Sequence, residues 1–311
     1  THALYHICAD ANEIDEAVIA VFMKMLPEDQ VKNFGVDFVR RIFKSLADEQ
    51  ALTRLSSAKP LPVDDPLYEH SKILVQCYRG VAFYRGLMSG DAIPSVELRK
   101  HGIRKVPTAS TEVAFEFLTA FLVQAHSVGI KTLVLCVDEA EYIFSQLADR
   151  KAAIVFNAIR SIYDLTTAPN QGLRFGDRIS NIVFFFAISS AGWSRLGVLE
   201  KTEARQGGPV QPLMTRLARV ISLRRLSETE TKDLIEGYLK TNRVTGKRES
   251  DPLIPYDEEF VEYVYKLTQG HPRSIIDRCD YVLVDGLRER IKRITKRYAK
   301  DVFERRHLPT S

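Results

Sequence analysis

The sequence lacks any long hydrophobic run. No stretch of its 311 residues approaches the roughly 18 consecutive apolar residues of a membrane-spanning helix, and no signal peptide is visible. It has only four cysteines, and their scattered positions show no metal-binding spacing. With 45% hydrophobic residues, 27% charged residues and a net charge of +4, the composition is typical of a soluble globular protein. We therefore expect no membrane partner, a cytoplasmic location, and free thiols rather than disulfides.

One stretch organises the rest of the chain. Leu133 to Val137 are five consecutive apolar residues, which predict a buried parallel strand, and Asp138 and Glu139 follow at once. The carboxyl ends of strands are where open α/β sheets bind ligands. At such an edge Asp138 suits Mg²⁺, and Glu139 suits the orientation and deprotonation of a water molecule. The alternative is a strand followed by an ordinary acid-rich helix start.

The remaining pattern predicts an α/β protein, with a three-layer parallel-sheet core over residues 1–225 and a helical lid domain over 226–311. Apolar runs predict further strands at 3–8, 181–188 and 220–223. Helical spacing predicts helices over 14–26, 38–46, 73–83, 111–128 and 152–165 in the core, and over 227–239, 257–267, 272–283 and 287–303 in the lid. Loops are expected at 55–68, 89–108 and 169–177, and 197–212 is expected to be mobile.

Three further positions stand where a nucleotide hydrolase needs polar groups. Ser189 and Ser190 follow the 181–188 strand, where the hydroxyl of either can hold an attacking water or a γ-phosphate; an ordinary turn is the alternative. Arg216 and Arg219 precede the 220–223 strand, where an arginine can stabilise charge at a neighbouring subunit's γ-phosphate, or can simply be solvated. Arg273 opens a helix of the lid, where it can fold over phosphates or remain a surface charge.

The order of these signals resembles that of the AAA+ superfamily. The chain looks most like the branch of initiator and loader ATPases related to origin-recognition proteins and STAND proteins, and like the ATP-binding proteins of BREX phage-defence systems, over roughly residues 3–285. The resemblance implies a P-loop NTPase fold, ATP bound between two domains, Mg²⁺, and oligomers or partner subunits on DNA. By the same resemblance, Asp138 (Mg²⁺) and Glu139 are the Walker B pair, Ser189 is sensor 1, Arg216 or Arg219 is the arginine finger, and Arg273 is sensor 2.

The chain departs from this family at one motif. The phosphate loop Gly-x-x-x-x-Gly-Lys-Ser/Thr is missing from the sequence. The family's first strand, which carries this loop, is central in the sheet, and the expected strand at 3–8 resembles the family's second. We therefore expect the first strand and its phosphate loop upstream of Thr1. The rival interpretation is a degenerate fold without a nucleotide site.

The carboxyl-terminal segment is rich in cations. Residues 288–306 contain nine lysines and arginines, and the apolar residues among them keep a nearly helical spacing, which predicts a helix with a basic face for DNA or a solvated one. Three functions follow: an ATPase that acts on DNA or a DNA-bound complex, a non-catalytic DNA-binding scaffold, and a STAND-type nucleotide-gated signalling switch. We favour the first of these functions, the ATPase.

Overall fold

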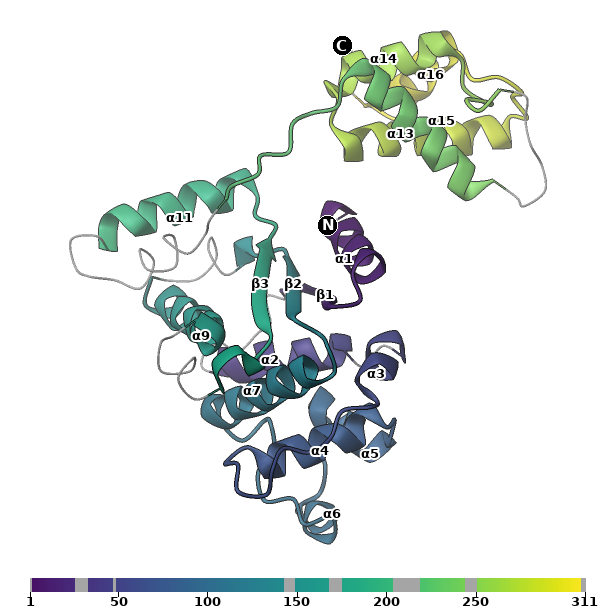
Figure 1. Cartoon of the computed structure of the whole chain (residues 1–311). Coiled ribbons are helices and arrows are strands. Elements are labelled where there is room, and N and C mark those ends of the chain that lie inside the picture. The colour runs from purple at the N-terminus through teal and green to yellow at the C-terminus, as the bar shows by residue number, and fades with distance from the viewer. Residues whose placement is uncertain are drawn as a thin grey trace. The chain divides into compact units, whose positions relative to one another are not determined.

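The chain folds into two compact units, which meet in sequence between Ala218 and Arg219 (Figure 1). The computed structural model describes residues 2–25, 33–46, 49–142, 149–167, 175–203, 219–243 and 251–308. Each unit has a hydrophobic core of its own, built around a sheet in unit 1 and around helices in unit 2. The expected domain boundary lies seven residues further along, between 225 and 226. In the described part of the chain, no helix combines the length and apolarity that crossing a membrane requires.

Unit 1 is built on a parallel sheet of order β1-β2-β3, so β2 is the central strand. The strands are β1 (Val18–Lys24), β2 (Thr132–Asp138) and β3 (Asn181–Phe186). Lys24 lies opposite Asp138 and Val137 lies opposite Phe186, so the carboxyl ends of all three strands meet at one edge. The prediction of an α/β fold with a parallel sheet, and of strands at 133–137 and 181–188, is confirmed.

Helices cover both faces of this sheet. Side chains alternate between the two faces of a strand, so each apolar strand places hydrophobic side chains on both faces. Ala20, Val134 and Cys136 point to one face, which α1 (His2–Ile14) covers. On the other face the strands join the main core, together with α2 (Phe34–Leu46), α7 (Thr111–Ser127) and α9 (Asp149–Thr167). The other described helices of unit 1 are α3 (Glu49–Leu55), α4 (Tyr68–Tyr78), α5 (Ala82–Ser89), α6 (Ser95–Lys100), the 3-10 turn η2 (Gly176–Arg178) and α11 (Ser190–Glu203).

The predictions for the first 26 residues were wrong, since the helix and the strand exchange places. The apolar residues of α1 (Leu4, Ile7, Cys8 and Ala11) recur at i, i+3, i+4 and i+7 and pack on the sheet as one helical face. The segment expected to be helical, 14–26, contains β1 instead. Its run of six apolar residues from Val18 to Met23 suits a strand whose two faces are both covered.

Two smaller predictions in unit 1 need correction. The helix expected over 73–83 is two helices, since α4 ends at Tyr78 and Gly80 adopts a positive φ of 82° before α5 begins. The loop expected over 89–108 contains the short helix α6. Within the loop expected at 169–177, residues 169–174 lie outside the described residues, as do 204–212 of the stretch expected to be mobile.

Unit 2 is helical. Its helices are α13 (Glu228–Asn242), α14 (Glu258–Thr268), α15 (Pro272–Arg288) and α16 (Lys296–Arg305). Fully buried aromatic side chains fill its core, among them Tyr256 and Phe260, whose rings stack at 4.6 Å. The Tyr256 hydroxyl donates a hydrogen bond to the Cys279 carbonyl oxygen at 3.0 Å, so this buried polar group is satisfied.

Two predictions for unit 2 were wrong. Residues 220–223 form no strand, and Val220, Ile221 and Leu223 are exposed. The helix expected over 287–303 is interrupted, because α15 ends at Arg288 and α16 begins only after Thr295. Between them Arg290 adopts a positive φ of 57°, which ends the helical path, and the Thr295 side chain caps the new helix.

Candidate functional site

The carboxyl edge of the sheet places Asp138 at the end of the central strand. Its backbone is fixed there, because the Met25 N–H donates to the Asp138 carbonyl oxygen at 3.0 Å. Strand periodicity puts Asp138 on the same face as Val134 and Cys136, the face that α1 covers. The residue is only 3% exposed. A carboxylate is therefore held, nearly buried, at the edge where open α/β sheets bind ligands.

Glu139 has an unusual backbone. Its φ is +55°, a left-handed conformation that side-chain-bearing residues seldom adopt. Hydrogen bonds from both sides hold it there: Met25 bonds to the preceding residue, and the Ala140 N–H donates to the Ala187 carbonyl oxygen at 3.1 Å. Such conformations cost about 1–3 kcal/mol, persist when the surroundings over-determine them, and cluster at functional sites. The strain fixes the direction in which Glu139 leaves the sheet.

Lys24 was missed by the sequence reasoning. It ends β1, shares the α1-covered face with Ala20 and Phe22, and its Nζ lies 3.9 Å from Glu139 Oε1. Both side chains are partly exposed, so the pair is weak and can rearrange when a charged ligand arrives. Because residues 14–26 were expected to form a helix, Lys24 was not recognised at the end of a strand. With β1 assigned correctly, a cation at the carboxyl end of a strand would have been a candidate site residue.

Ser189 lies at the same edge, after β3. Its Oγ accepts a hydrogen bond from the Gly192 N–H at 3.2 Å, so it caps α11, while the hydroxyl hydrogen can still be donated. The first turn of α11 lies close to the segment after β2. A Cβ added to Gly192 would stand 2.8 Å from the Cβ of Glu141, so only glycine fits there without a shift. The structure thus brings Asp138, Glu139 and Ser189 to one edge.

The amino-terminal end of α1 lies at this edge too. The Tyr5 ring packs on the Phe22 ring, near the carboxyl end of β1, with centroids 6.2 Å apart. Further along α1, the Asn12 side chain exchanges two hydrogen bonds with the backbone of Ala20, at 2.8 and 2.9 Å. Helix α1 therefore runs antiparallel to β1 and begins beside the strand ends (Figure 1). The partial positive charge of a helix start favours anions at that place.

The three predicted arginines lie outside the described residues of unit 1. Arg216 lies outside the described residues. Arg219 and Arg273 belong to unit 2, where both are exposed, and Arg273 lies in the first turn of α15. Their proposed roles toward a nucleotide stay predictions.

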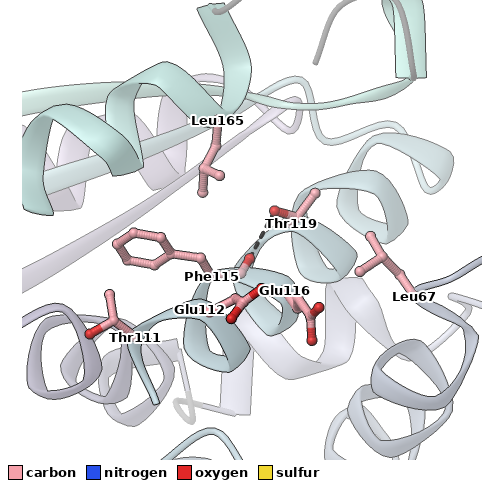
Figure 2. Close-up of a pocket in the computed structure, with 7 residues that line it drawn as sticks. All are labelled: Leu67, Thr111, Glu112, Phe115, Glu116, Thr119 and Leu165. Atoms are coloured by element: carbon pink, nitrogen blue, oxygen red, sulfur yellow. Dashed lines mark hydrogen bonds between the residues drawn. The ribbon is translucent and has the colours of Figure 1, made fainter. Parts of the chain in front are cut away.

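A separate pocket of about 430 Å³ opens beside the first half of α7 (Figure 2). None of the predicted site residues lines it. Behind its wall, the buried His70 places Nε2 3.1 Å from Glu116 Oε2, and burial lowers the pKa of this histidine. The lining residues are Leu67, Thr111, Glu112, Phe115, Glu116, Thr119 and Leu165.

Comparison with known proteins adds no relative: no family model, no curated protein and no solved structure matches the chain. Among the described residues, no group of three or more histidine, cysteine or acidic side chains is arranged to hold a metal ion.

Proposed function

We propose that this chain is the core of an AAA+-like ATPase, which binds ATP with Mg²⁺ at the carboxyl edge of the sheet and acts on DNA or a DNA-bound complex. One observation carries the proposal. A nearly buried aspartate and a strained glutamate end the central strand, on the edge where helix α1 begins. A helix start and oxygen ligands at the carboxyl edge of a parallel sheet suit a magnesium-bound phosphate group.

The oxygen donors at this edge suit a magnesium ion that is bound together with the phosphates of a nucleotide. Mg²⁺ keeps several waters and binds through one or two carboxylates plus the phosphates of the substrate, so a closed cage of protein ligands is not needed. Asp138 supplies one such carboxylate, and the hydroxyl of Ser189 is a further oxygen at the same edge. The ion would neutralise charge on the phosphates of bound ATP.

Glu139 is the residue that we assign to proton transfer. A carboxylate held in a fixed direction can orient a water molecule and take its proton as the water attacks the γ-phosphate. Lys24 lies within reach of the same carboxylate. Its ammonium group can turn to a phosphate oxygen when ATP binds.

The open edge of β3 fits the expectation of a further strand that carries a phosphate loop. Among the described residues β3 has β2 as its only neighbour, yet its sequence Ile-Val-Phe-Phe-Phe is apolar on both faces. Such a strand is typical of a sheet interior, whereas edge strands normally carry charges or proline. Val183 is 38% exposed. A parallel strand beside β3 would cover this surface and place its following loop beside Ser189, at the same edge of the sheet as Asp138.

The test is ATP hydrolysis by the protein expressed from its complete gene. Glu139→Gln should still bind ATP but turn it over about 10²–10⁴-fold more slowly, because the base that takes the proton is lost. Glu97→Gln, on the exposed helix α6, is the matched control and should behave as the wild type. Unchanged turnover in Glu139→Gln would remove this residue from the mechanism. If calorimetry detects no ATP binding by the wild type, the non-catalytic scaffold is the better hypothesis.

A specific observation favours DNA as the polyanionic partner. Several cations of the 288–306 segment are paired with acids, for example Arg305 with Glu289 and Arg306 with Asp285, each at 2.7 Å. Arg290, Lys292 and Arg297 are exposed and form no ion pair with the described residues. Exposed cations without acidic partners are the ones that exchange counterions for phosphates. Slow turnover with retained nucleotide and no DNA binding would instead favour the signalling switch.

A further inference from the structure

Two of the four cysteines meet between α1 and the central strand. Cys8 lies on the face of α1 that packs on the sheet, and Cys136 lies on β2, opposite Phe22 of β1 and Phe185 of β3. The two thiols are hydrogen-bonded to each other. They belong to one hydrophobic cluster, although 128 positions separate them in the sequence. Folding therefore brings them together.

The two thiols differ in a way that suits sequential oxidation. Cys8 is half-buried, so a small oxidant can reach it, whereas Cys136 is completely buried. The hydrogen bond from Cys136 lowers the pKa of Cys8, which favours the reactive thiolate, and it raises the pKa of Cys136. The Asn12 side chain also donates toward Cys8 Sγ, at 3.9 Å. Redox-sensitive cysteines share this arrangement of an accessible thiolate beside a resolving thiol.

The other two cysteines show no such arrangement. Cys77 is buried in α4, and burial raises its pKa to about 11. Cys279 is buried in α15 of unit 2, where burial also raises its pKa. Neither thiol is therefore expected to react first with an oxidant in solution, and neither packs with Cys8 in its cluster. They serve as internal controls for any reaction that needs an accessible thiolate.

We propose that Cys8 and Cys136 form a reversible disulfide when a hydroperoxide oxidises Cys8, which would link α1 covalently to the central strand. This inference does not depend on the proposed ATP hydrolysis. The link would lie two residues before Asp138 and within the helix that begins beside it. A disulfide at this place fixes the position of α1 against the strand that carries the candidate site.

The reaction balances with the peroxide as the only oxidant. The Cys8 thiolate attacks one peroxide oxygen, so that an S–O bond forms, the O–O bond breaks and an alcohol or water leaves. The Cys136 sulfur then attacks the sulfur of the Cys8 sulfenic acid. An S–S bond forms, and the sulfenic oxygen leaves as water with the Cys136 proton. The two sulfurs together supply the two electrons that the peroxide accepts, and a dithiol reductant reverses the change.

The experiment treats the full 311-residue chain with hydrogen peroxide and then counts its thiols in denaturant. We expect half of the four thiols to be lost, and peptide mapping without reductant to find Cys8 joined to Cys136. Dithiothreitol should restore all four. Retention of all four thiols, or a map that joins either cysteine to Cys77 or Cys279, would overturn the proposal.

Variants separate the two steps. Cys136→Ala keeps an apolar side chain in the core, and peroxide should then leave Cys8 as a sulfenic acid that dimedone labels. In the wild type the disulfide should remove most of this labelling. Cys77→Ala is the matched control and should still lose two thiols, those of Cys8 and Cys136. Equal dimedone labelling of Cys8 in the wild type and in Cys136→Ala would contradict a resolving role for Cys136, whatever the effect of either variant on stability.

Discussion

The two units present their charges differently. At the sheet edge of unit 1, Asp138 is 3% exposed and Glu139 is held in a strained backbone conformation by hydrogen bonds on both sides. In unit 2 the charged side chains of 288–306 are exposed and many are paired with acids on the same surface. The first arrangement positions single groups for directed chemistry. The second suits binding through many weak and exchangeable contacts, which salt screens.

The largest expected effects test whether the two cores are separate. Phe121→Ala in unit 1 removes a ring that packs on Phe43 and Tyr78, and Phe260→Ala in unit 2 removes one that stacks on Tyr256. Each buried ring should cost about 3–5 kcal/mol of unfolding free energy in its own unit. Hydrogen exchange measured along the chain resolves the two units. Equal loss of protection in both units from either substitution would show that they fold as one.

Asp138→Asn should have the next largest effect, because it removes the charge but keeps the shape. We expect turnover to fall about a hundredfold, which is about 2.7 kcal/mol, and magnesium to stop tightening nucleotide binding. Glu112→Gln, on the pocket of α7, alters a carboxylate outside the candidate site and is the control. If Asp138→Asn responds to magnesium as the wild type does, the ion binds elsewhere.

The sequence predicted the strands that carry the site because their pattern has few alternatives. Five apolar residues before Asp138, and the apolar run before Ser189, are too short for most helices and too apolar for loops. Their register, which aligns both carboxyl ends, followed from the parallel sheet. The left-handed φ of Glu139 could not be predicted, since it results from hydrogen bonds with the residues that follow β1 and β3.

The errors at the amino terminus have a physical cause. Six residues from Ala3 to Cys8 look like a strand, but Leu4, Ile7 and Cys8 form one apolar face of a helix together with Ala11. Pattern alone does not separate the two until it is known which segment pairs with β2. The placement of Arg219 and Arg273 relative to Asp138 lay beyond the sequence for a different reason. It depends on the relative placement of the two units, which local patterns do not encode.

A moderate effect is expected from the exposed cations of unit 2. The triple substitution of Arg290, Lys292 and Arg297 by alanine should weaken DNA binding to a similar extent on all sequences. It should also reduce the slope of log affinity against log salt by about 2–3, because each lost phosphate contact removes about one unit. Fluorescence anisotropy on a labelled duplex at several salt concentrations measures both quantities.

A matched triple substitution in unit 1 is the control for net charge. Replacing Arg79, Arg99 and Lys100 by alanine removes the same charge from another exposed surface, and it should leave the slope unchanged. Equal slopes for the two triple variants would mean that the charge of the whole chain, and not this surface, attracts DNA.

The smallest effect is a pH dependence at the start of α13. Glu230 accepts hydrogen bonds from Arg224 and from the Ser227 N–H, and these lower its pKa from the usual 4.5 to about 2. Because the folded pKa is the lower one, the unfolded chain binds more protons between these two values. The stabilisation is therefore complete above about pH 4.5 and is lost as the pH falls toward 2. Since the site is exposed, the contribution is modest.

Denaturant unfolding of unit 2 at a series of pH values measures this dependence. Glu230→Gln cannot ionise, so its stability should change less between pH 4.5 and pH 2 than that of the wild type. Glu228→Gln alters a carboxylate in the same helical turn and should keep the wild-type slope. Identical pH profiles for the wild type and Glu230→Gln would mean that neither the capping box nor the pair with Arg224 stabilises the ionised form of Glu230 in solution. This charge at the start of a helix would then contribute no more to stability than the other exposed charges of unit 2.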